Sequence, residues 1–240
     1  MYLVLFPIAL LLAVLGVAVK YFKWHWLIAG YNTMPREKKE KVDVAGLGNF
    51  LGNWMFILAG LFLVRGLLGR LKIVYLDLIF VSLLFILMFH MLIQAQRYDH
   101  NPKTKSDRII LGLVAGFLLL IGLAVPVLIY FSSLPAPVYI EEGHLNIGGI
   151  YGGETPITEI KEIALEESMP KILRKVNGFD GGMVRKGRFR VEELGEGRLY
   201  IHSAKGPYLF ITTPNSYIII NYREGEQTKK LYQDLTAALE

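Results

Sequence analysis

The sequence predicts a helical membrane region with four transmembrane helices, followed by a small all-β domain that ends in one helix. Of the 240 residues, 53% are hydrophobic, and the mean hydropathy is +0.39. This apolar content exceeds that of an ordinary soluble chain, and it is concentrated in the first 131 residues. From residue 138 onward, short β-type runs alternate with glycine-rich turns, which is typical of antiparallel strands.

Four stretches are apolar enough to cross a bilayer. A hydrocarbon core about 30 Å thick requires roughly 20 helical residues. The first stretch is interpreted as a span and not as a signal peptide, because no Lys or Arg precedes it and no small-residue cleavage site precedes Lys20. The predicted spans are residues 2–19, 44–64, 73–93 and 109–131.

The charges are distributed unevenly along the chain. Residues 1–131 hold 13 Lys and Arg against 6 Asp and Glu, whereas residues 132–240 hold 13 against 15. The basic half is therefore the membrane half, which favours contact with anionic lipid over binding of nucleic acid. Loops 20–43 and 97–108 together carry ten Lys and Arg, and the loop between them carries three. The positive-inside rule places these two loops in the cytoplasm and both termini outside.

Three polar or glycine features lie within the predicted spans. Asp77 suggests either a proton or ion path, or an interfacial ion pair with Arg70 or Lys72. His90, on the same helix, is either part of such a path or a hydrogen-bonded packing residue. Gly112 and Gly116 have the spacing of a helix-packing face.

The second half begins with a stiff linker at residues 132–137 and continues as a soluble domain over residues 138–240. The last segment, 226–239, has the spacing of an amphipathic helix. The predicted strands are 138–141, 144–147, 160–165, 172–177, 188–192, 198–202, 208–212 and 217–222.

Residues 138–238 resemble the bacterial PH-like domains. The resemblance is carried by the run from Lys175 to Phe189 (KVNGFDGGMVRKGRF), by the following Leu-Tyr-Ile strand, and by the Glu-Gln-Thr-Lys-Lys-Leu-Tyr segment. It implies a barrel of seven or eight antiparallel strands closed by one C-terminal helix. PH relatives bind phosphoinositides through a basic loop, but residues 148–154 contain no Lys or Arg.

The membrane half is similar to an uncharacterised bacterial membrane family of about three helices, a domain of unknown function. The similar residues are Leu27–Met34 (LIAGYNTM) with Glu37, Lys38 and Asp43, and the match covers about residues 1–95. This resemblance implies no catalytic residues.

A basic cluster is the candidate binding site of the second half. It contains Arg174, Lys175, Arg185, Lys186, Arg188 and Arg190. Such a cluster could hold anionic headgroups or cell-wall polyanions. Alternatively, it is a solvated strand surface balanced by nearby glutamates.

The sequence contains no recognisable catalytic or metal-binding pattern. The absence of cysteine excludes disulfides and thiolate metal sites. The five histidines are scattered without ligand spacing, and the glycine-rich runs match neither a dinucleotide nor a phosphate loop. We therefore predict a non-enzyme without cofactor or metal.

Together these observations predict a protein that binds a protein or peptide partner at the membrane surface, in envelope assembly or sensing. The alternative is a small transporter or channel component that uses Asp77 and His90. A membrane-bound hydrolase is a weaker alternative, since no convergent acid/base pair is found.

Overall fold

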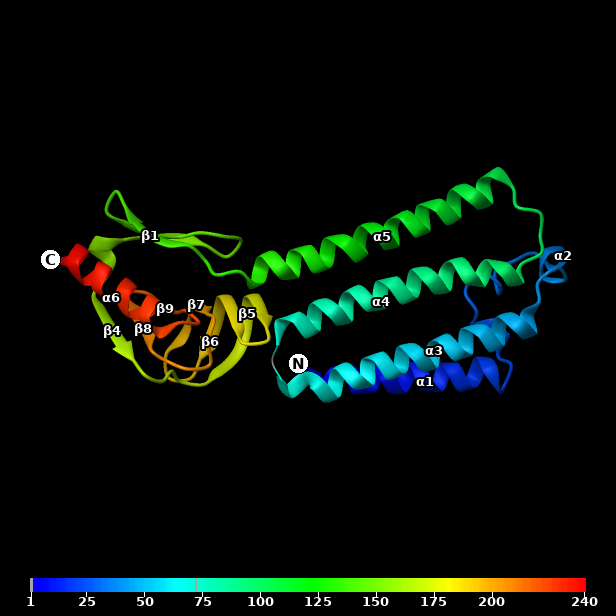
Figure 1. Cartoon of the computed structure of the whole chain (residues 1–240), viewed down its shortest axis with the longest axis horizontal. Helices are drawn as coiled ribbons and strands as arrows, with labels where there is room; N and C mark the ends of the chain where they lie inside the picture. Colours follow the sequence, from blue (N-terminus) through cyan, green and yellow to red (C-terminus); the bar gives the residue numbers. More distant parts are fainter. Residues whose placement is uncertain (1, 72) are drawn as a thin grey trace. The chain divides into compact units, whose positions relative to one another are not determined.

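The computed structural model describes residues 2–71 and 73–240, apart from the side chains of Tyr2 and Arg70. The described chain forms two compact units (Figure 1). The helical region comprises the residues up to Leu71 together with Tyr75–Val127, and the second unit, which we call the sheet domain, comprises Leu128–Glu240 together with residues 73 and 74.

Among the described residues, three helices coincide with predicted spans and are long and apolar enough to cross a membrane. The helices long and apolar enough to cross a membrane cover Val44–Leu67, Val74–Tyr98 and Lys105–Ser133. The first apolar stretch forms a shorter helix of 16 residues, about 24 Å long at 1.5 Å per residue. This helix is shorter than the span predicted for residues 2–19 and is not among the three helices long enough to cross a membrane. The elements are η1 (Tyr2–Val4), α1 (Leu5–Lys20), η2 (His25–Leu27), α2 (Arg36–Lys39), α3 (Val44–Leu67), η3 (Leu68–Leu71), α4 (Val74–Ala95), η4 (Gln96–Tyr98) and α5 (Lys105–Ser133).

Helices α1 and α3 pack antiparallel through small residues. A Cβ added to Gly52 would lie 2.6 Å from the Lys20 Cβ and 3.1 Å from the Gly16 carbonyl oxygen. Near the other end, a Cβ on Gly66 would lie 3.1 Å from the Phe6 ring. Glycines let helix backbones approach closely, so this glycine seam fixes the pairing. Lys20 Nζ then donates a 2.7 Å hydrogen bond to Asn53 Oδ1 at the end of α1.

The glycine pair expected to form a packing face does not form one among the described residues. A Cβ added to Gly112 or Gly116 in α5 would meet no atom within 4 Å. The same four-residue spacing occurs at Gly48 and Gly52 in α3, where it does form a packing face. Sequence spacing alone could not distinguish the two pairs.

The sheet domain contains nine strands in two sheets. One sheet has the order β1-β2-β3 and the other β4-β8-β9-β7-β6-β5. All strand pairs are antiparallel except β7 with β9, which is parallel. The strands are β1 (Val138–Glu141), β2 (His144–Ile147), β3 (Gly153–Pro156), β4 (Glu162–Glu166), β5 (Ile172–Gly181), β6 (Val184–Val191), β7 (Gly195–Ile201), β8 (Tyr208–Thr212) and β9 (Tyr217–Asn221), and they are followed by α6 (Gly225–Leu239).

The sheets are not closed into a barrel, so the predicted closed PH-like barrel is wrong. Strands β4 and β5 are the two edges of the six-stranded sheet. The segment joining them, residues 167–171, can span at most about 20 Å. Five flat strand spacings would separate the edges by about 24 Å. The sheet is therefore curled, but its edge strands β4 and β5 do not pair with each other.

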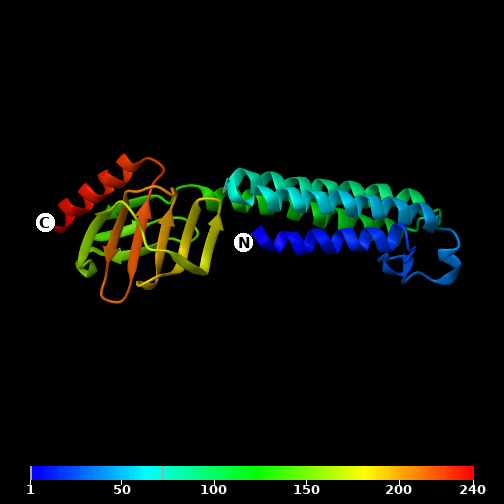
Figure 2. The ribbon, with the colours of Figure 1, turned by 90° about the horizontal axis from the view of Figure 1, so that it is seen from below.

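Both faces of the curled sheet carry an apolar core. On one face, Leu209, Ile211 and Ile220 pack with Leu231 and Leu235 of α6, which lies across the sheet in Figure 2. On the other face, Phe189, Val191, Leu199 and Ile219 form a second cluster. Met169, from the segment joining β4 to β5, packs against this second cluster. This contact holds the connecting segment against the sheet.

The expected linker 132–137 packs against the sheet domain. Ala136 is 5% exposed and belongs to the same core cluster as Leu145 and Leu209. The buried Lys186 Nζ donates a 2.6 Å hydrogen bond to the Leu134 carbonyl oxygen. These contacts make residues 132–137 an integral part of the sheet domain.

Candidate functional site

Asp77, at the start of α4, forms an ion pair with Arg65 near the end of α3. Arg65 Nη2 lies 2.5 Å from Asp77 Oδ1, and the two side chains are 4% and 19% exposed. The interpretation of Asp77 as one half of an ion pair is therefore correct, with Arg65 as a partner. The partners expected from the sequence, the Arg70 side chain and Lys72, lie outside the described residues.

His90, the other predicted intramembrane polar residue, lies on an exposed part of α4. Its ring centroid is 5.5 Å from that of Trp54 in α3, with the planes tilted by 45°. Asp77 and His90 are thirteen residues apart on one helix, about 20 Å at 1.5 Å per residue. The structure therefore does not bring the two residues together.

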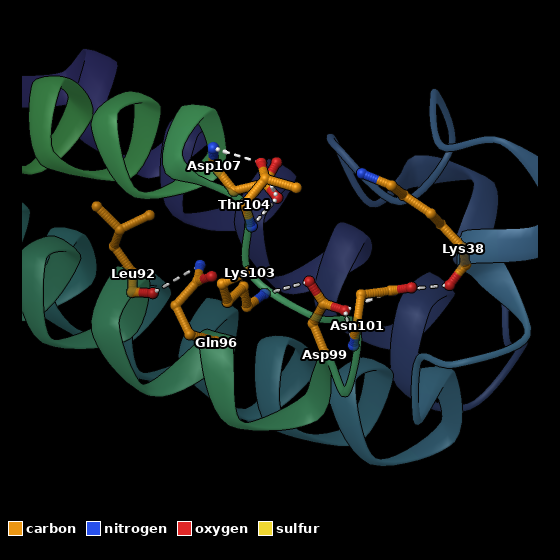
Figure 3. Close-up of polar contacts among 8 residues, drawn as sticks. All are labelled: Lys38, Leu92, Gln96, Asp99, Asn101, Lys103, Thr104 and Asp107. Atoms are coloured by element: carbon orange, nitrogen blue, oxygen red, sulfur yellow. Dashed lines mark hydrogen bonds and ion pairs between the residues drawn. The ribbon is translucent and has the colours of Figure 1, made fainter.

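The loops before α3 and after α4 join into one polar cluster at one end of the helical region. Val42 and Asp99 form an isolated antiparallel bridge. The Asp43 amide donates to the Tyr98 carbonyl at 2.8 Å. Asn101 Nδ2 donates to the Lys38 carbonyl at 2.8 Å, as Figure 3 shows. These contacts place loops 20–43 and 97–108 at the same end, as their shared positive charge predicts.

Asp99 organises this loop cluster. Its carboxylate accepts hydrogen bonds from Lys103 Nζ and from the side chain of Asn101, as Figure 3 shows. Burial of the carboxylate acts to raise the Asp99 pKa, but the hydrogen bonds from Lys103 and Asn101 outweigh it and leave the pKa below its ordinary value. Asp99 is thus held as an anion that ties the loop together.

The predicted basic cluster divides into separate environments. Arg174 on β5 and Arg188 and Arg190 on β6 lie on one face of the sheet, and we call these three residues the arginine row. Their guanidinium groups converge on Glu196 of β7, with N–O distances of 3.4, 3.3 and 3.7 Å. The three arginine side chains are 61%, 62% and 49% exposed, so the row faces solvent.

The other members of the predicted cluster do not belong to this row. Arg185 forms an ion pair with Asp180 at 3.4 Å. Lys186 is 7% exposed, and its burial lowers the pKa of its amine. Lys175 points to the opposite face of β5, because it pairs with Phe189 in the sheet register. The alternation of side chains along a strand separates residues that are adjacent in sequence.

A polar core residue that the sequence did not indicate is His202, which follows β7. It is 2% exposed, and neither ring nitrogen has a hydrogen-bond partner among the described residues. Desolvation, together with the nearby charges of Lys186 and Arg223, lowers the His202 pKa to about 4. The imidazole is therefore neutral at pH 7. The neighbouring Asn221 is fully buried, and its Oδ1 accepts a 2.9 Å hydrogen bond from the His202 amide.

Two open grooves lie on the face of the curled sheet opposite the arginine row. They share Ser168, Met169 and Pro170, which separate them. The groove of about 550 Å³ is lined by four glutamates, including Glu162 and Glu192. The groove of about 400 Å³ contains Arg185 and Lys205 together with Glu167. The acidic groove and the arginine row thus present opposite charges on opposite faces.

Within the described part of the chain, no group of three or more His, Cys, Asp or Glu side chains is arranged to hold a metal ion. The notable side-chain arrangements are the buried Arg65–Asp77 pair, the arginine row and buried His202.

Residues 6–99 match a family model described as "Domain of unknown function (DUF3784)". The match supports the resemblance inferred from the LIAGYNTM segment, and it runs from within α1 through η4. It includes neither α5 nor the sheet domain. No curated protein and no solved structure matches this chain. None of these comparisons supports the expected PH-like resemblance of residues 138–238.

Proposed function

We propose that this chain is a membrane-anchored, non-catalytic binding protein, and that its sheet domain holds an extended segment of a partner protein along β5. The observation that carries this proposal is the exposure of five consecutive edge-strand residues, 173–177. They include two apolar side chains, Leu173 at 51% and Val176 at 39% exposure. An edge strand with exposed apolar residues offers both backbone hydrogen bonds and side-chain contacts to a partner strand.

The irregular pairing of β5 gives this edge selectivity. Register shifts occur between Ile172 and Arg174 and between Lys175 and Asn177. Bulges and charged side chains restrain indiscriminate pairing at sheet edges. A partner must therefore match the side chains of β5 as well as its backbone, as expected of a specific role in envelope assembly or sensing.

The helical region would anchor this binding domain in the cell membrane, with lipid around α3, α4 and α5. The excess of Lys and Arg in loops 20–43 and 97–108 supports a cytoplasmic position for both. Because α5 leads from the second of these loops to the sheet domain, the sheet domain would then lie outside the cytoplasm. This placement depends on α5 alone and not on whether α1 crosses the membrane.

The alternative function, a small transporter or channel component that uses Asp77 and His90, has less support. Asp77 is bound by Arg65, which suits a structural ion pair better than a mobile ion site. Flux of protons or ions that disappears in Asp77→Asn, in liposomes containing the correctly folded variant, would favour this alternative.

Site-specific photo-cross-linking in native membranes tests the proposed function. A photoreactive phenylalanine analogue is placed at Leu173, at Val176, or at the control position Ile150, which is 66% exposed in the turn between β2 and β3. We expect one defined adduct from positions 173 and 176 that is absent from position 150. Equal adducts at all three positions, or none at 173 and 176, would overturn the proposal.

Binding of the purified adduct partner then provides the quantitative test. Leu173→Asp with Val176→Asp should abolish that binding, because a charge replaces each apolar contact at the edge. Ile150→Asp is the matched control and should leave it unchanged. Both variants alter exposed residues, so thermal unfolding should remain close to that of the wild type.

A further inference from the structure

The arginine row carries more positive charge than the fold requires. Arg174 and Arg190 are direct register partners on β5 and β6, and Arg190 is opposite Glu196 on β7. Two residues before Arg190 on β6, Arg188 is opposite Arg198 of β7. Arg198 Nη2 donates to Thr155 Oγ1 at 2.8 Å. Like charges placed directly opposite each other destabilise a sheet. A single carboxylate, that of Glu196, is the ion-pair partner of all three guanidinium groups of the row.

Stability does not account for this arrangement. Each arginine of the row is about half exposed or more, with side-chain exposures between 49% and 62%. Ion pairs at such exposure contribute about 0–1 kcal/mol. Three pairs that share one carboxylate also leave two cations without a full counter-charge. The row is better explained by an anionic group that comes from outside the chain.

We propose that the arginine row binds carboxylate side chains of the extended partner segment, with Glu196 occupying the site in their absence. This inference rests on the proposed function, because it gives the chemistry of the segment that lies along β5. A guanidinium group can donate two parallel hydrogen bonds to one carboxylate, in a forked geometry. The partner segment is therefore acidic on the side that faces the row.

The spacing of the row favours a peptide over a lipid headgroup. Arg188 and Arg190 are two residues apart on β6, which places them about 6.6–6.8 Å apart along the strand. Alternate side chains of an extended peptide repeat at the same distance. The exposed apolar residues Leu173 and Val176 lie on the adjoining strand, so a segment of acidic residues interspersed with apolar ones matches the surface.

The test measures binding of fluorescein-labelled decapeptides to the full-length chain in phosphatidylcholine nanodiscs. One peptide alternates Glu with Val, and the control peptide alternates Gln with Val. We expect saturable binding of the Glu peptide, weakened by salt, and at least about tenfold weaker binding of the Gln peptide. Equal affinity for the two peptides would overturn the proposal.

Charge variants locate the binding. Arg174→Gln, Arg188→Gln and Arg190→Gln combined should weaken binding of the Glu peptide at least about tenfold. The control variant, Lys161→Gln, Lys229→Gln and Lys230→Gln, removes three exposed cations elsewhere and should stay within about twofold of the wild type. Glu196→Gln should tighten binding severalfold, because it removes the internal competitor. A merely structural Glu196 would not produce this gain.

Two further outcomes show whether the acid-binding role of the arginine row fails or the proposed docking along β5 fails. If soluble short-chain phosphatidylserine binds the row more tightly than the Glu peptide does, the row is a lipid site and the inference is wrong. If the arginine variant loses the peptide while Leu173→Asp with Val176→Asp retains it, the row binds acid but the proposed docking along β5 fails. Thermal unfolding of each variant confirms that it is folded.

Discussion

In the helical region, large apolar side chains point outward, whereas in the sheet domain they pack inward. None of the residues in the most apolar windows of α4 and α5 is buried within the structure. All five residues of β9 are buried. Exposed apolar surface on this scale is unfavourable in water, so the contrast is compatible with helices that span a membrane and with a sheet domain that supplies its own core.

Polar groups follow the same division. The helical region buries an ion pair, Arg65 and Asp77, whereas the sheet domain buries the neutral Asn221 and His202 and one amine, Lys186, which donates to a carbonyl oxygen. Removing one partner of a buried ion pair leaves the other charge uncompensated. Single substitutions should therefore have the largest effect where they leave a charge unbalanced.

The strongest expected effect comes from Asp77→Ala. Removal of one partner of a buried pair typically costs about 3–5 kcal/mol, because the Arg65 guanidinium remains in an apolar environment. Thermal unfolding in nanodiscs measures the loss. The double variant Arg65→Met with Asp77→Leu should recover most of it. A loss below about 1 kcal/mol for Asp77→Ala would show that the pair is not buried.

The sheet domain should lose stability in acid through His202. Its pKa is lowered to about 4 in the folded chain, so the unfolded chain binds the proton first. Stability is unaffected above about pH 6.5 and falls as the pH drops to 4, by about 3 kcal/mol for 2.5 pKa units. Hydrogen–deuterium exchange of β7 and β9 measures the loss. In His202→Leu this part of the pH dependence should be absent, and an unchanged profile would refute the assignment.

A smaller effect separates two glycines that look equivalent in the sequence. Gly52→Ala should destabilise the α1–α3 pair by about 1–3 kcal/mol through overpacking, because its Cβ would lie 2.6 Å from the Lys20 Cβ. Gly116→Ala meets no atom within 4 Å and should stabilise α5 by about 0.5–1 kcal/mol. Thermal unfolding of the two variants in matched nanodiscs provides the comparison. Equal changes in stability would contradict close packing of α1 and α3 at Gly52.

Local signals in the sequence predicted much of the fold. Three apolar stretches became α3, α4 and α5, and strands β1, β2 and β8 have the predicted bounds. Strands β5 and β6 extend further toward each other than predicted, because the turn is confined to Gly182–Met183, and Gly178, Gly181 and Gly187 lie within the strands. Strand β3 was missed, because its Gly and Pro are unfavourable strand residues and only pairing with β2 holds it.

The remaining features depend on contacts between distant residues. The parallel pairing of β7 with β9 and the open, curled sheet have no local sequence signal. The sequence marked the arginine row as part of a basic cluster, but only contacts with distant residues distinguish exposed Arg188 and Arg190, beside Glu196, from buried Lys186, beside Leu134. Glu196 and His202 acquire their significance from neighbours on other strands, which composition and spacing do not reveal.

Water-accessible cysteine labelling tests the division between lipid-covered helices and a self-contained sheet domain most directly. The chain has no cysteine, so each single-cysteine variant reports one position without background. In native membranes, cysteines replacing Leu113 and Leu120 of α5 should resist a water-soluble maleimide until detergent is added. Cysteines replacing Ile150 and Leu173 of the sheet domain should react at once when the reagent reaches their side of the membrane. Equal labelling of the α5 and sheet-domain positions before detergent would contradict the account.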